Sequence, residues 1–350
     1  MLTALLLAVT LVLPAAAQED PPVLVGGRPA AGVFQAVTPA SVGGVLLSIG
    51  PSDPFPAPYD SLLFQGELPD AGASFQAARE ANGSWSAWKT AVLSRRGDGR
   101  FWARVDFPGR GTGRLRVRAL AKPGSTGAPV TVYSMQVFTR GPERPAPGPS
   151  GSGPEGAAPP LPVIERSAWG AKPPKEPYTP DVPVKVTQHH SAGRQTHSLA
   201  ESEAELRFIQ DFHQNGRGWN DIAYHFLIDA DGRIFRGRPV DVVGSHTLDD
   251  NTGNVGICLL GNHHPPANDP VTPAELASIV RVGRWLQARY GITPDKYLGH
   301  RDRNPGHTDC PGDGLYALLP RIRAMWEGTP SLASRLGDWL ERVRARAAAF

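Results

Sequence analysis

The sequence predicts an α/β domain, with a mixed central sheet flanked by helices, that follows an N-terminal all-β sandwich domain. Residues 24–140 contain short runs of alternating apolar and polar residues separated by Gly, Pro and Asp turns, a pattern typical of a sandwich. Residues 163–326 instead alternate strand-like runs with helical periodicity, as expected for an α/β sheet. The stretch between them, residues 141–162, is dominated by Pro, Gly, Ser and Ala and predicts a semi-stiff linker.

In the first domain, Arg116 and Arg118 face away from Val117 with the period of two that a half-buried strand requires. The same kind of alternation predicts strands at residues 45–49, 101–107, 114–120 and 130–138. No constellation of metal-ligating residues occurs in this domain, so its sequence does not indicate a function.

Turn and capping signals define the elements of the second domain. Ser198 and Glu201 form a capping box at the start of one helix. Thr272 and Glu275 do the same for a second helix, which Gly291 ends. The expected elements are, in order, a strand at 184–188, a helix that includes 206–213, a hairpin of 224–229 and 233–236, a central strand at 255–260, a helix at 272–290 and a last helix at 313–326.

The two ends of the chain carry separate signals. Residues 1–17 are apolar and close on an Ala-x-Ala pattern, which predicts a signal peptide and therefore a secreted or periplasmic protein. Residues 327–350 are basic and helix-prone, and they predict a C-terminal helix that packs back on the domain. The net charge of +3 is small, no later segment is apolar for long enough to span a membrane, and no dense Lys/Arg run is interleaved with aromatic residues. We therefore expect neither stable membrane insertion nor nucleic-acid binding.

Metal-ligating side chains occur at two places in the second domain. One strand run ends in His189 and His190, and a polar loop further along contains His300 and Cys310. Histidines and a cysteine are the ligand set of a mononuclear zinc site, and three protein ligands leave the fourth position open for water. Such a site is catalytic rather than structural and indicates a hydrolase. The other cysteine, Cys258, lies in an apolar run and is expected to be a buried thiol rather than a disulfide partner.

Short motifs follow one another through the second domain, at residues 166–171, 189–192, 218–226, 231–233, 237–238, 244–247, 254–257 and 299–302. With these motifs the domain resembles the type-2 N-acetylmuramoyl-L-alanine amidases and the animal peptidoglycan recognition proteins. The resemblance implies a zinc-dependent peptidoglycan hydrolase that cleaves the amide bond between N-acetylmuramic acid and L-alanine of the stem peptide. The alternative is a non-catalytic peptidoglycan-binding recognition protein. In both cases the implied partner is peptidoglycan of the cell wall, and protein partners are not indicated.

The resemblance also implies roles for individual residues. These are His189, His300 and Cys310 as zinc ligands, Tyr224 and Thr308 in catalysis, and His246 and Trp219 in substrate binding. The spacing between His300 and Cys310 is longer than in many relatives, which leaves His307 as a rival third ligand. Cys310 is preferred because the residues around it match the family's closing motif.

Overall fold

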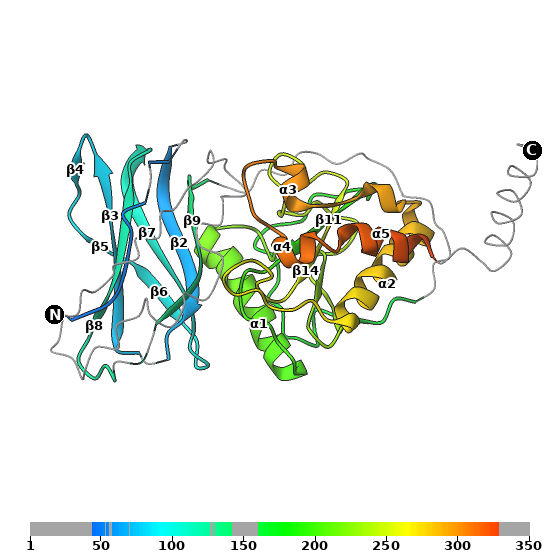
Figure 1. The fold of residues 1–350 in the computed structure, drawn as a ribbon, viewed down its shortest axis with the longest axis horizontal. Helices are drawn as coiled ribbons and strands as arrows, with labels where there is room; N and C mark the ends of the chain where they lie inside the picture. Colours follow the sequence, from blue (N-terminus) through cyan, green and yellow to red (C-terminus); the bar gives the residue numbers. More distant parts are fainter. Residues whose placement is uncertain are drawn as a thin grey trace, which may run out of the picture.

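The computed structural model describes residues 44–141, except positions 53, 56, 57, 70, 127 and 129, and residues 160–328. The predicted signal peptide, most of the predicted linker and nearly all of the predicted C-terminal helix lie outside these residues. Within the described parts, no helix is both long and apolar enough to cross a membrane. A β-sandwich and an α/β domain lie side by side, with helix α1 (Leu199–Asp211) next to the sandwich (Figure 1). The predicted fold class is therefore confirmed.

The sandwich consists of two antiparallel sheets. One has the strand order β1-β8-β3-β4, with β5 also paired to β3, and the other has the order β6-β7-β2-β9. The strands are β1 (Val45–Ile49), β2 (Tyr59–Glu67), β3 (Ala73–Ala81), β4 (Ser84–Trp85), β5 (Lys89–Thr90), β6 (Val92–Arg95), β7 (Arg100–Gly111), β8 (Leu115–Ala121) and β9 (Thr131–Phe138). All four predicted strand runs are confirmed. The run at 45–49 has the predicted bounds, and the other three differ from the prediction at one or both ends.

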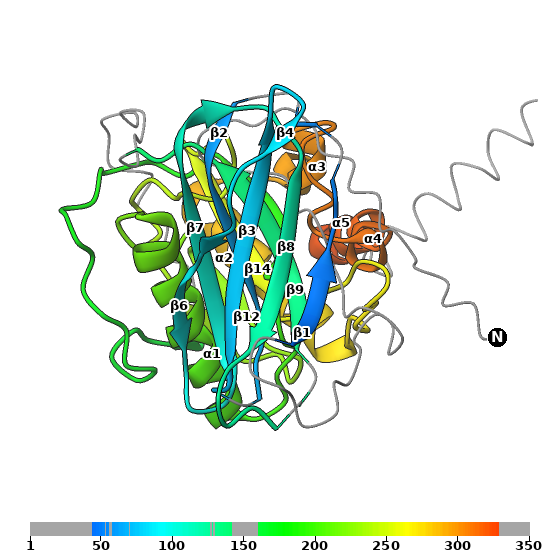
Figure 2. The same cartoon turned by 90° about the vertical axis from the view of Figure 1, so that its left-hand side faces the viewer.

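The sheet that contains β2 is buried on both faces. Along β2, Leu62 and Phe64 belong to the core between the two sheets. Leu63, between them in the sequence, packs instead in a cluster that includes residues of the α/β domain. Since successive side chains of a strand point to opposite faces, this sheet separates the sandwich core from the second domain. Figure 2 shows the sandwich seated across one side of the α/β domain.

The α/β domain is built on a six-stranded mixed sheet with the order β10-β13-β12-β14-β11-β15. The strands are β10 (Val163–Ile164), β11 (Lys185–His190), β12 (Phe226–Ile228), β13 (Ile234–Arg236), β14 (Asn254–Leu259) and β15 (Tyr297–Gly299). Strands β12 and β13 form the predicted antiparallel hairpin. Strand β14 is central, as its continuous apolar sequence predicts, because both of its faces are covered.

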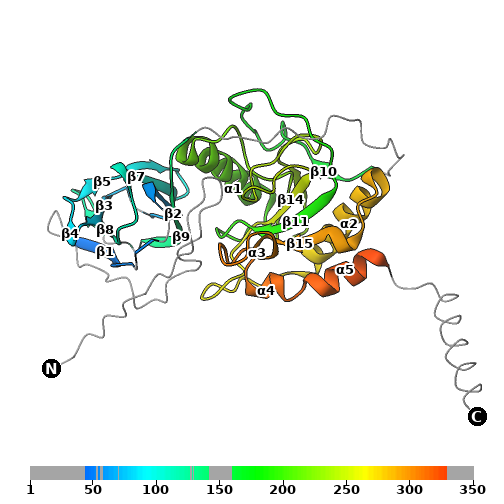
Figure 3. The same ribbon diagram turned by 90° about the horizontal axis from the view of Figure 1, so that it is seen from above.

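Helices cover both faces of this sheet (Figure 3). They are α1 (Leu199–Asp211), the π-helical turn η1 (Phe212–Arg217), α2 (Pro273–Tyr290), the 3₁₀ turn η2 (Pro294–Lys296), α3 (His300–Arg303), α4 (Asp313–Tyr316) and α5 (Leu319–Glu327). Both predicted capping boxes are present, and Gly291 ends α2 with a φ of 71°. The single last helix predicted at 313–326 was wrong, because it is divided into α4 and α5. Pro320 lies at the start of α5, and its missing N–H cannot continue the hydrogen bonds of α4.

Candidate metal centre

Two parallel strands bring the predicted histidine ligands together. Strands β11 and β15 pair directly, with Gln188 opposite Gly299. His189 follows Gln188 on β11, and His300 follows Gly299 as the first residue of α3. The carboxyl ends of parallel strands lie at one edge of a sheet, which is where open α/β sheets bind ligands. The two buried imidazole rings are accordingly 4.5 Å apart between centroids.

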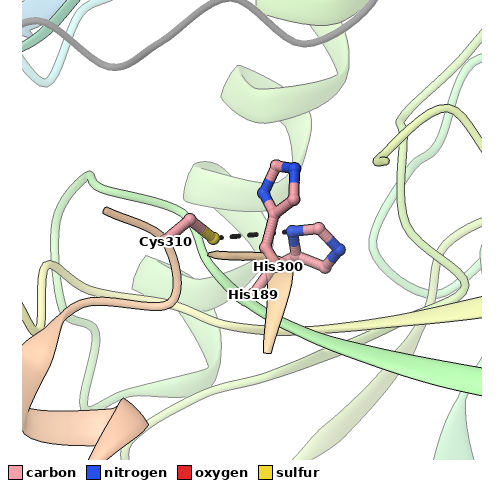
Figure 4. Close-up of side chains that lie close together, drawn as sticks. All are labelled: His189, His300 and Cys310. Carbon is pink, nitrogen blue, oxygen red and sulfur yellow. Dashed lines mark hydrogen bonds between the residues drawn. The ribbon is translucent and has the colours of Figure 1, made fainter. Parts of the chain in front are cut away.

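The loop after α3 folds back and places Cys310 beside these rings. The backbone N–H of Arg301 donates to the carbonyl of Cys310 at 2.9 Å, which closes the loop. Cys310 Sγ then lies 3.5 Å from His189 Nδ1 (Figure 4). One ligand atom from each of His189, His300 and Cys310 lies within 4.8 Å of the other two, and all three residues are buried. His307, the rival third ligand, is not a member of this group among the described residues.

The donor atoms fit a zinc ion. Zinc bonds of about 2.3 Å to sulfur and about 2.0–2.1 Å to nitrogen, at a tetrahedral angle, separate the two ligand atoms by about 3.6 Å. The observed separation of Nδ1 and Sγ is 3.5 Å. Two imidazoles and a thiolate are also the borderline and soft donors that zinc selects.

A chain of hydrogen bonds explains why His189 Nδ1 carries the lone pair. The carbonyl of Asn254 can only accept, so His246 Nε2, at 2.9 Å, must be the protonated nitrogen. In a neutral imidazole His246 Nδ1 is then an acceptor, and His189 Nε2 lies 3.0 Å from it. His189 therefore donates from Nε2 and directs an unprotonated Nδ1 toward Cys310. Burial holds the pKa of His189 well below its usual value, and the neighbouring His300 and His246 lower it further. This imidazole is therefore neutral.

The two predicted catalytic side chains lie beside the cluster. The ring of Tyr224 is half-buried, and its centroid is 5.1 Å from that of His189. Its side chain also hydrogen-bonds that of Cys258, whose pKa burial raises. Thr308 Oγ1 accepts from the backbone N–H of Cys310 at 3.1 Å, so the hydroxyl caps the loop and retains its own proton for donation. Cys258 and Cys310 are both free thiols.

A cavity of about 70 Å³ lies next to these residues. Tyr224, Thr308, His300 and Cys310 line it together with both predicted substrate-binding residues, His246 and Trp219. His246 is 2% exposed, and its Nδ1 lies next to His189 Nε2. The sequence motifs did not predict this contact with a candidate zinc ligand. The ring of Trp219 packs at a tilt against that of His213, with centroids 5.0 Å apart.

Sequence reasoning missed several residues of this cavity. His213, which the sequence placed only within a predicted helix, lines the cavity, and so does Arg217. Gln65, Ser134 and Gln136 of the sandwich also line it. The helical spacing of His213 with Leu206 and Ile209 places it on one face of the helix, but no motif or composition signal marks the three sandwich residues.

These features define an α/β protein with a candidate mononuclear zinc centre at the carboxyl edge of its sheet. The sequence profile described as N-acetylmuramoyl-L-alanine amidase matches residues 179–313, which lie within this domain. Peptidoglycan-recognition protein LB of Drosophila melanogaster is 34% identical over 162 residues, which cover 45% of this chain and 67% of that protein. The chain therefore belongs to the family of N-acetylmuramoyl-L-alanine amidases and peptidoglycan-recognition proteins.

Further relatives carry both names. N-acetylmuramoyl-L-alanine amidase of Sus scrofa is 34% identical over 163 residues, 45% of this chain and 26% of that protein. This chain thus matches about a quarter of the pig protein's length. Among solved structures, wild-type Drosophila PGRP-LB is 35% identical, with a TM-score of 0.40 and coverage of 45% of this chain and 91% of that chain.

Proposed function

We propose that this protein is a zinc-dependent peptidoglycan hydrolase that cleaves the amide bond between N-acetylmuramic acid and L-alanine of the stem peptide. The observation that carries the proposal is the buried group of His189, His300 and Cys310, whose ligand atoms lie within 4.8 Å of one another beside a cavity. Family membership supports the substrate class. Relatives have been solved with tracheal cytotoxin, a monomeric diaminopimelic acid-type peptidoglycan, and with a glycosamyl muramyl pentapeptide.

His189, His300 and Cys310 would hold the metal. When bound, zinc would act as a Lewis acid that polarises the scissile carbonyl and lowers the pKa of the attacking water. Tyr224 and Thr308 would each donate a hydrogen bond to the carbonyl oxygen as it becomes negative, because both line the cavity and both carry a hydroxyl proton. The C–N bond then breaks and the nitrogen of L-alanine takes a proton, which Tyr224 would relay.

His246 and Trp219 would bind substrate from the cavity wall. His246 would in addition orient His189, since their ring nitrogens are 3.0 Å apart. The division into a sandwich at 24–140 and an amidase domain at 163–326 belongs to the same proposal. So does a secreted or periplasmic location at the cell wall, which the apolar residues 1–17 support.

A digest of purified sacculi with the full-length protein tests this function. We expect stoichiometric zinc by elemental mass spectrometry and free stem peptides with a new N-terminal L-alanine by peptide mass spectrometry. Cys310→Ala should lose both zinc and activity, because two histidines alone hold zinc weakly. Cys258→Ala, at the only other cysteine of the chain, should keep its zinc and serves as the matched control.

Other outcomes would decide against this assignment. Retention of zinc by Cys310→Ala together with loss of zinc from His307→Ala would move the third ligand to His307. A wild-type protein that contains zinc and binds sacculi but releases no stem peptide would be a recognition protein. Full activity of metal-free Cys310→Ala would contradict the mechanism.

A further inference from the structure

The cavity beside the candidate zinc ligands has walls from both domains. Most of its lining belongs to the α/β domain, but Gln65 of β2 and Ser134 and Gln136 of β9 also face it. We propose that this part of the β-sandwich is a wall of the substrate pocket, and that Gln136 binds neutral amide or hydroxyl groups of the muropeptide. The proposal rests on the function proposed above, because it assigns the sandwich to the same site.

A buried ion pair holds the two domains together. Arg100 of β7 donates to both carboxylate oxygens of Glu205 on α1, at 2.8 and 2.6 Å. The two side chains are 0% and 1% exposed. The Arg100 guanidinium also lies over the ring of Phe208, 4.0 Å from its centroid. Because charges at this depth are costly unless they are paired, both side chains favour the docked arrangement, and the sandwich keeps its place beside the cavity.

An apolar cluster extends the same interface. It combines sandwich and α/β residues, which include Leu63, Trp102, Phe138, Leu206, Phe208, Ile209 and Phe212. Trp102 Nε1 also donates to Asp211 at 2.8 Å. Gly216 lies so close to Leu63 that a Cβ there would stand 3.2 Å from both of its methyl carbons. A hydrophobic interface of this kind favours a rigid arrangement over independent motion of the domains.

Strand pairing places the three sandwich side chains on the face that meets the cavity. In the β2–β9 pair, Gln65 lies opposite Ser134, and Leu63 lies opposite Gln136. Gln65 Nε2 donates to Ser134 Oγ at 3.0 Å, and its Oε1 accepts from Arg100 at 2.9 Å. Gln136 is half-buried and makes no side-chain hydrogen bond within the described part of the chain. Gln65 and Ser134 thus stabilise the wall, and Gln136 presents an unused amide to the cavity.

The size and chemistry of the cavity limit which groups of the substrate it can bind. Its volume is about 70 Å³, whereas pockets that enclose a small ligand ordinarily measure about 300–1,000 Å³. The cavity therefore takes only a small part of a muropeptide. The charged side chain in the lining, Arg217, belongs to the α/β domain, whereas the sandwich side chains offer amides and a hydroxyl but no charge. The sandwich wall therefore matches neutral hydrogen-bonding groups rather than a carboxylate. Neutral hydrogen-bonding groups of a muropeptide are the hydroxyl and N-acetyl groups of its sugars and the amides of its stem.

Variants of the full-length protein at Gln136 test whether the sandwich wall binds substrate. Gln136→Ala removes the amide, and Gln136→Trp fills the cavity. Gln76→Ala, on β3 of the other sheet, is the matched control. Kd is measured by calorimetry in a Tyr224→Phe background, which slows hydrolysis and keeps the zinc ligands. The probes are a muramyl dipeptide, a muramyl tetrapeptide and a muramyl dipeptide extended by N-acetylglucosamine. KM and kcat are measured for the same variants with Tyr224 intact.

We expect Gln136→Ala to raise Kd about 2- to 12-fold, the effect of one lost neutral hydrogen bond, with zinc content and melting temperature unchanged. Gln136→Trp should raise Kd further, and Gln76→Ala should not change it. An effect confined to the extended probe identifies the glycan as the bound group, and one that grows with stem length identifies the peptide. If Kd is unchanged for both Gln136 variants and the protein still digests sacculi, the sandwich does not bind substrate through Gln136. That result would overturn this proposal and leave the proposed function intact. A wild-type protein that neither binds nor hydrolyses any probe contradicts the proposed function itself.

Discussion

Replacing Arg100 by methionine keeps a long, unbranched side chain at this position. It removes the cation that joins the sandwich to α1. In the native protein this guanidinium donates two hydrogen bonds to Glu205, one to the carbonyl of Gly66 and one to Gln65 Oε1. The variant leaves the buried Glu205 carboxylate without the cation that it contacts. Removal of one partner of a buried ion pair costs about 3–5 kcal/mol of unfolding free energy. The two additional unpaired acceptors place Arg100→Met at the upper end of that range.

A double-mutant cycle separates the interaction within the pair from the damage at each site. Arg100→Met combined with Glu205→Met leaves neither charge buried, so its loss of stability should be smaller than the sum of the single losses by about 0.5–3 kcal/mol. Urea unfolding followed by tryptophan fluorescence measures each value. Arg140→Met is the control, because Arg140 is 51% exposed in its ion pairs with Asp60 and Asp106 and should lose less than about 1 kcal/mol. Equally small losses for Arg100→Met and Arg140→Met would refute the reasoning.

Three further predictions concern the site and its surroundings. His246→Ala should weaken zinc about 10- to 100-fold in a chelator competition, because it removes the partner that orients His189; unchanged affinity would mean that His189 is held by other contacts. Tyr224→Phe should keep zinc and lower kcat about 100- to 1,000-fold, and an unchanged kcat would exclude the phenol from the reaction. Burial lowers the pKa of His225 from 6.5 to about 4. The unfolded chain therefore binds the extra proton, and stability present above pH 6.5 should fall toward pH 4 by about 1.4 kcal/mol per pH unit. Between pH 7 and pH 5, the free energy of unfolding in urea should fall less for His225→Gln than for the wild-type protein. An identical fall in both proteins would contradict this assignment.

Local signals explain why much of the α/β domain could be predicted. Thr272 and Glu275 satisfy the first N–H groups of α2 reciprocally, so the start of this helix depends on residues that are neighbours in the sequence. The break between α4 and α5 was missed although Pro320 is visible in the sequence. A proline is tolerated in the first turn of a helix, and periodicity alone does not distinguish one helix with an early proline from two helices.

The candidate metal centre could be predicted only in part. The ligand types and the strand end at His189 are readable, because parallel strands place their carboxyl ends together. Which loop residue reaches the histidines is not readable, because it depends on where the loop closes. The hydrogen bond from the Arg301 N–H to the Cys310 carbonyl brings Cys310 Sγ, rather than His307, next to the His189 ring. The contact between His189 and His246 joins residues far apart in the sequence and was likewise not predicted.

The sandwich shows where alternation stops being informative. Along β7, Phe101 and Ala103 face the sandwich core, whereas Arg100 and Trp102, which alternate with them, face outward. An outward arginine on an alternating strand normally indicates a solvated face. Here that face is covered by α1, and the arginine is buried because Glu205 supplies the opposite charge. Alternation assigns residues to a shared face but does not identify what covers that face. An interface stabilised by one charge from each domain therefore looks, in either domain's sequence, like ordinary surface, and only the paired structure reveals that the sandwich reaches the site.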